Sequence, residues 1–63
     1  MVFKQEFRNY YKSSMGSIEK CLRADLEEIR KENPYNVVLV KDVKIVMCEN
    51  EMINALAIFD IYS

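Results

Sequence analysis

The chain has 63 residues, of which 51% are hydrophobic and 30% charged, and its formal net charge is −1. A chain of this length forms one domain, expected over residues 1–63, and buries only about 60% of its unfolded surface, so its core is marginal. The apolar content excludes a disordered chain, and the charge gives no general attraction to nucleic acid or acidic membranes.

The first segment, residues 2–15, is predicted as a helix because its apolar residues recur at helical spacing: Phe3, Phe7, Tyr10 or Tyr11, and Met15. The same segment also fits a strand that carries Phe3, Phe7 and Tyr11 on one side and charged residues on the other. It contains no proline or glycine that would separate the two interpretations. A third strand, giving a βαββ order, is therefore the alternative.

The second segment, residues 17–33, has the pattern of an amphipathic helix. Its apolar stripe consists of Ile18, Leu22, Leu26 and Ile29, with Cys21 beside it. Ser17 is predicted as the N-cap because its hydroxyl can accept a free backbone N–H of the first turn. Pro34 disfavours helical geometry at Asn33, so the helix is expected to end there.

The last part of the chain predicts two strands, residues 36–48 and 52–62, that pair as a long antiparallel hairpin. Both are rich in β-branched and aromatic residues, and Glu49, Asn50 and Glu51 separate them as a polar turn. Lys41 and Asp42 interrupt the first strand and are interpreted as a local irregularity, since they make a poor two-residue turn. The predicted fold is α+β, with the main helix packed on the hairpin.

Side-chain alternation assigns the two faces of this hairpin. The face toward the helix supplies, with the helix stripe and the N-terminal aromatics, the predicted core: Phe3, Phe7, Ile18, Leu22, Leu26, Ile29, Val37, Leu39, Val43, Ile45, Phe59 and Ile61. The outer face is predicted to be a self-association interface containing Val38, Val40, Val46, Leu56, Ile58 and Tyr62. Such an apolar patch is unusual on a monomer, and a two-fold homodimer would cover it by using one patch twice.

The residue types argue against an enzyme. The chain has no histidine, one glycine and two cysteines 27 positions apart, so no catalytic group, cofactor site or metal site is predicted. Cys21 and Cys48 are interpreted as reduced, packed thiols of a cytoplasmic protein. No apolar run reaches the roughly 20 residues that span a bilayer, so no membrane contact is expected.

Two charged groups are weaker candidates for binding. The N-terminal cations and aromatics are a candidate nucleic-acid contact made by Lys4, Arg8, Tyr11 and Lys12. Asp25, Glu28 and Glu32 form a candidate acidic face for a partner protein. Each group is also explained as a solvated surface, and the negative overall charge weakens the case for nucleic acid.

The predicted function is that of a non-enzymatic, homodimeric interaction module that regulates or inhibits another protein by occupying its surface. In size and composition the chain is similar to inhibitors encoded by phages and mobile elements, which is an analogy only. The alternative is a small nucleic-acid-binding protein that uses the N-terminal segment.

Overall fold

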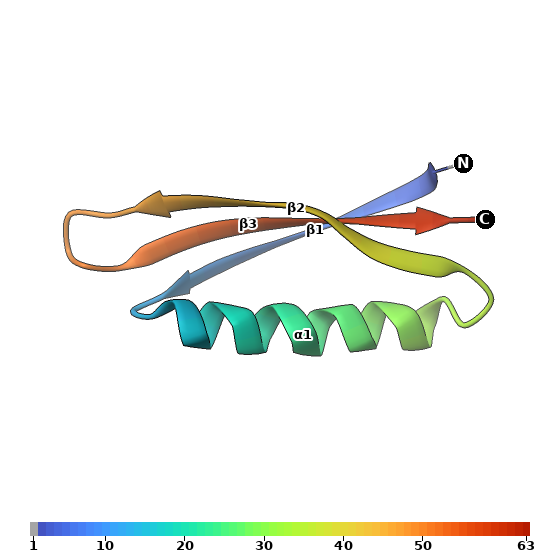
Figure 1. The fold of residues 1–63 in the computed structure, drawn as a ribbon, viewed down its shortest axis with the longest axis horizontal. Helices are drawn as coiled ribbons and strands as arrows, with labels where there is room; N and C mark the ends of the chain where they lie inside the picture. The colour runs from blue at the N-terminus through green and yellow to red at the C-terminus, as the bar shows by residue number, and fades with distance from the viewer. Residues whose placement is uncertain (1) are drawn as a thin grey trace.

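The computed structural model describes the backbone of residues 2–63 and the side chains of residues 4–63. The elements are β1 (Val2–Lys12), α1 (Met15–Glu32), β2 (Val37–Met47) and β3 (Ile53–Tyr62). The three strands form one antiparallel sheet in the order β1-β3-β2, and α1 runs along one side of it (Figure 1). The α+β prediction is confirmed in this coarse form.

The prediction of an N-terminal helix is wrong, and the strand alternative holds. Residues 4–12 pair with β3 along nearly its whole length, from Lys4 opposite Ile61 to Lys12 opposite Ile53. β3 is the central strand, and without β1 one of its edges would leave its backbone groups unpaired. This long-range pairing outweighs the helical spacing of the apolar residues, because strand formation depends on packing against neighbouring strands more than on local preference.

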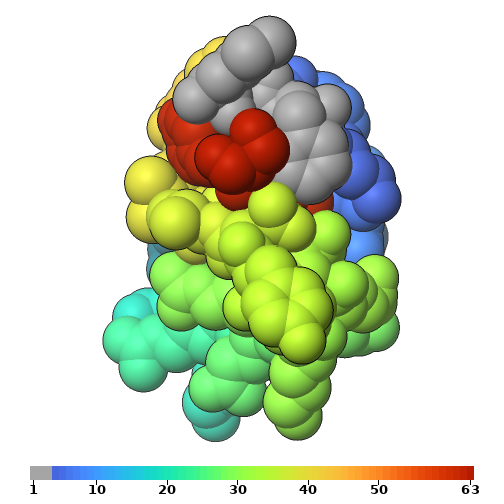
Figure 2. All heavy atoms as spheres, turned by 90° about the vertical axis from the view of Figure 1, so that its right-hand side faces the viewer, coloured from blue at the N-terminus to red at the C-terminus, as the bar shows by residue number. Residues whose placement is uncertain are grey.

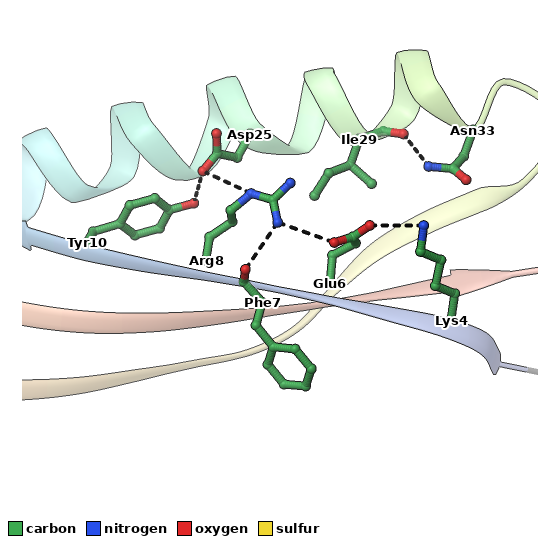
Figure 3. Close-up of polar contacts among 8 residues, drawn as sticks. All are labelled: Lys4, Glu6, Phe7, Arg8, Tyr10, Asp25, Ile29 and Asn33. Atoms are coloured by element: carbon green, nitrogen blue, oxygen red, sulfur yellow. Dashed lines mark hydrogen bonds and ion pairs between the residues drawn. The ribbon is translucent and has the colours of Figure 1, made fainter.

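The helix begins earlier than predicted, because Ser14 and not Ser17 is the N-cap. The Ser14 hydroxyl accepts the backbone N–H of Ser17 at 3.2 Å, and α1 starts at Met15. At the other end the Asn33 backbone N–H donates to the Ile29 carbonyl at 3.0 Å. The Asn33 side-chain amide donates to the same oxygen at 2.8 Å (Figure 3). Pro34 follows, so the predicted stop is confirmed within one residue.

β2 and β3 are antiparallel neighbours whose connecting turn extends past the N-terminal end of α1 (Figure 1). The Cys48 N–H donates to the Met52 carbonyl at 2.8 Å and closes the turn. Glu51 adopts a positive φ of 62°, a conformation that turns require and that L-residues rarely take. The Asn50 amide donates to the Tyr11 hydroxyl at 2.8 Å, which ties this turn to β1.

A bulge in β2 reverses the alternation of its side chains. Val40 lies opposite Phe59 while Asp42 lies opposite the next residue, Ile58, so Lys41 is an extra residue in the strand. Before the bulge Val38 and Val40 therefore lie on the helix side and Val37 and Leu39 on the other. The predicted faces of these four residues are wrong for this reason.

The core lies between α1 and the sheet. In the end-on view of Figure 2, the green atoms of α1 lie below the ends of the strands. Its buried hydrophobic residues are Tyr10, Ile18, Ile29, Val38, Ile53, Ala55, Ala57, Phe59 and Ile61. The core prediction is confirmed for Ile18, Ile29, Phe59 and Ile61, and Leu22, Leu26 and Val43 pack against these as partly buried residues. It is wrong for Phe7, Val37, Leu39 and Ile45, which are exposed, and Phe3 lies outside the described side chains.

Candidate functional site: the open face of the sheet

The side of the sheet turned away from α1 is a surface that no described element covers. Directly opposed residues share a face, so the register identifies its members. We call it the open face: Gln5, Phe7, Asn9, Tyr11, Val37, Leu39, Asp42, Lys44, Val46, Asn54, Leu56, Ile58, Asp60 and Tyr62. All three strands contribute to it, and Figure 3 shows the Phe7 ring pointing away from the helix.

Large apolar side chains dominate the open face and are accessible to solvent. Five of them are about half exposed or more: Phe7 54%, Tyr11 52%, Val37 58%, Leu39 48% and Val46 62%. Leu56, Ile58 and Tyr62 lie between these on the central strand and are half-buried. Several large exposed apolar side chains gathered on one face mark an interaction site more often than singly scattered ones do.

The open face also carries a buried carboxylate. Asp60 is only 5% exposed, and its two oxygens accept hydrogen bonds from Gln5 Nε2 at 2.7 Å and from the Tyr62 hydroxyl at 3.4 Å. Further along the sheet, a shallow hollow of about 320 Å³ opens between Asn9, Lys44, Val46, Asn54 and Leu56. The open face therefore has a hollow and a polar group held in place by hydrogen bonds. Both features limit the orientations in which a second surface can pack against it.

The structure brings together four of the six residues predicted for self-association: Val46, Leu56, Ile58 and Tyr62. It separates Val38, which is buried beneath α1, and Val40, which lies on the same side, because of the bulge at Lys41. Sequence reasoning missed Phe7, Tyr11, Val37 and Leu39. The strand interpretation of residues 2–15 would have placed Phe7 and Tyr11 together. The irregularity predicted at Lys41 and Asp42 is the bulge that sets the face of Val37 and Leu39, but the sequence did not show that it reverses the alternation.

The candidate nucleic-acid residues do not share a surface. Lys4, Arg8 and Lys12 lie on the helix side of β1, and Tyr11 lies on the open face. Lys4 Nζ is 3.1 Å and Arg8 Nη1 is 3.3 Å from the Glu6 carboxylate (Figure 3). The hydrogen bond from Lys4, supported by Arg8, lowers the pKa of Glu6 below its ordinary value of 4.5. Glu6 therefore stays ionised and counters both cations.

The candidate acidic face is divided as well. Asp25 turns toward β1, where it accepts the Tyr10 hydroxyl at 2.5 Å and lies 4.0 Å from Arg8 Nε (Figure 3). Burial, followed by the hydrogen bond to Asp25, raises the pKa of Tyr10 well above its ordinary value of 10.0. Glu28 and Glu32 remain exposed on the helix. Asp25 thus holds α1 on β1 and is not free for a partner.

Among the described residues, no three side chains of histidine, cysteine, aspartate or glutamate lie close enough to hold a metal ion. In the same part of the chain, no helix has the length and apolar character needed to cross a membrane. No family model matches the chain, and neither a curated protein nor a solved structure is found to be similar to it.

Proposed function

We propose that this chain is a small non-enzymatic interaction module, a homodimer joined through the open face, that regulates or inhibits another protein by occupying its surface. The observation that supports this most is the apolar open face, with its five large exposed side chains on the side of the sheet that α1 does not cover. The ion pairs of Lys4 and Arg8 with Glu6 make a protein a better-supported partner than a nucleic acid.

The open face of one copy approaches the smallest area of a specific interface with a second copy. Three strands of ten residues, spaced about 4.8 Å apart and rising about 3.3 Å per residue, present roughly 450 Å² per copy. Two copies packed face to face bury about 900–1,000 Å² in total, close to the lower limit for a specific interface. Exposed helix residues such as Glu28 and Glu32 then remain outside and available to the partner.

The experiment that tests the homodimer is absolute mass by light scattering over a hundredfold range of concentration. The wild-type chain should keep at least twice the mass of one chain on dilution. Ile58→Glu places a carboxylate in the middle of the open face and should lower the mass or make the protein insoluble, with helix content unchanged. Tyr35→Glu is the matched control, because Tyr35 is 97% exposed in the α1–β2 connection.

Two outcomes would contradict the proposal. One is a wild-type chain that is a stable, soluble monomer at every concentration. The other is an Ile58→Glu variant whose mass and dilution behaviour equal those of Tyr35→Glu. Either result would mean that the open face is tolerated in water and that the partner surface must lie elsewhere.

A further inference from the structure

The outer edge of β2 has backbone groups between residues 43 and 47 that β3 does not use. The Cys48–Met52 hydrogen bond sets the phase of the β2–β3 ladder, in which bonded and non-bonded pairs alternate. Val43, Ile45 and Met47 then occupy the non-bonded positions, and their N–H and C=O groups point away from β3. The Asp42 side chain accepts the Val43 N–H at 2.8 Å, as expected for an outward-pointing donor.

The side chains along this edge are apolar. Ile45 is 44% and Met47 is 68% exposed, both on the helix side. A hollow of about 270 Å³ lies between the first turns of α1 and β2, lined by Met15, Leu22, Val43 and Ile45 among others. Edge strands usually carry charges that prevent pairing, and β1, with its charged residues, is an example. Between Val43 and Met47, β2 has only Lys44.

We propose that this edge pairs with the same edge of a second copy, antiparallel and about a two-fold axis at Ile45, so that two sheets become one sheet of six strands. Ile45 lies opposite Ile45 of the second copy, and Val43 lies opposite its Met47. Outward groups then meet outward groups and form about four backbone hydrogen bonds, donated by Ile45 and Met47 of the two copies, while each Val43 N–H stays bonded to Asp42. The helix-side row is apolar throughout.

The charges and the alternation select this register. A two-fold axis at Lys44 would place two ammonium groups directly opposite each other, which is destabilising. An axis at Val46 would keep fewer opposed pairs of outward groups. Val43, Ile45 and Met47 alternate along the edge and are all apolar. The antiparallel edge of a second copy therefore places an apolar side chain opposite each of them.

The area of the open face supports the same occupant. Edge pairing about an axis normal to the sheet keeps both helices on one side and makes the two open faces continuous. The composite face measures roughly 900 Å², which reaches the approximately 800 Å² per partner of a standard interface, whereas one copy does not. Because this step rests on the proposed function of the open face, the expected assembly has four chains: two edge-joined pairs packed through composite open faces.

The test combines edge and face variants in light scattering, with circular dichroism as the check of folding. Ile45→Pro removes an outward N–H that β3 does not use, and proline is tolerated on edge strands. Ile45→Lys opposes two ammonium groups across the axis and serves if the proline variant does not fold. We expect four chains for wild type, two for either Ile45 variant, two for Ile58→Glu and one for the combination. Tyr35→Lys is the matched control and should keep four chains.

The outcomes separate the two proposals. A wild-type dimer that Ile58→Glu dissociates and the Ile45 variants leave unchanged would overturn edge pairing and keep the open-face dimer. A dimer dissociated only by the Ile45 variants would keep edge pairing and overturn the open-face dimer. A wild-type monomer would overturn both and leave the β2 edge to a strand of another protein.

Discussion

The two faces of the sheet have similar apolar content but opposite environments. On the helix side of the central strand, Ala55, Ala57, Phe59 and Ile61 are all completely buried. On the open face, Phe7 and Val46 of the outer strands are more than half exposed, and Leu56 and Ile58 of the central strand are half-buried. Burial therefore depends on coverage by α1 and by neighbouring strands and not on size alone, since Ile45 and Met47 are exposed on the helix side of the edge strand.

The residue sizes on the helix side explain how α1 reaches the sheet. Ala55 and Ala57 are small and allow the helix to approach β3 closely, while Ile18 and Ile29 of α1 and Phe59 of β3 fill the space beside them. On the open face, small and large residues do not alternate in this way, and no described element packs against them. One face is thus packed within the chain, and no described element packs on the other.

The largest expected effect comes from phenylalanines on opposite faces. Phe59→Ala should lower the free energy of unfolding by about 3–5 kcal/mol, because it leaves a cavity in a fully packed core. Phe7→Ala should lower it by only about 1 kcal/mol when measured at chain concentrations low enough to keep the protein monomeric, because Phe7 is half exposed and loses mainly its cross-strand contact with Ile58. Urea unfolding at a fixed chain concentration makes the measurement.

If Phe59→Ala does not fold, Phe59→Leu keeps most of the volume and should lower the free energy of unfolding by about 1 kcal/mol. Equal costs for the Phe59 and Phe7 truncations would contradict the difference between the faces. They would indicate that the open face is packed within the monomer.

A smaller effect is expected from adding volume to each face. Ala57→Leu should lower the free energy of unfolding by about 1–3 kcal/mol, since the helix lies against this position and must move. Asn54→Leu adds comparable bulk beside the hollow on the open face and should change it by less than about 0.5 kcal/mol. Thermal unfolding of both variants makes the measurement. An Ala57→Leu variant with unchanged stability would show that α1 does not pack closely against β3 at this position.

The smallest effect distinguishes two neighbouring tyrosines. Tyr10→Phe removes the hydrogen bond to Asp25 and should lower the free energy of unfolding by about 1 kcal/mol at pH 7. Tyr11→Phe, whose hydroxyl bonds the exposed Asn50, should change it by less than about 0.5 kcal/mol.

The pH dependence adds a second measurement for Tyr10. Its pKa in the folded chain lies above the unfolded value near 10.0, so above that pH the unfolded chain loses this proton first. The contribution of Tyr10 is therefore complete below pH 10 and is lost as pH rises further. Tyr10→Phe should flatten the alkaline decline of stability relative to Tyr35→Phe, and an unchanged decline would place the Tyr10 hydroxyl in water.

The sequence alone determined the elements whose signals are local. The apolar stripe of residues 18–29 and Pro34 predicted the helix and its end, and two β-branched runs around Glu49 to Glu51 predicted the paired strands. From these strands the sequence also placed Val46, Leu56, Ile58 and Tyr62 on one outer face. Each of these patterns depends on residues that are close together in the sequence, so it can be recognised without knowledge of long-range contacts.

Only the tertiary structure decided the state of residues 2–12 and the faces of Val37 to Val40. The N-terminal segment fits a helix and a strand equally well, and the free edge of β3, more than 40 residues away in the chain, selects the strand. A bulge at Lys41 exchanges the faces of every residue before it, because side chains alternate with a period of two and one extra residue reverses them. Lys41 and Asp42 marked an irregularity in the sequence, but only the pairing across the sheet shows that it is a one-residue bulge.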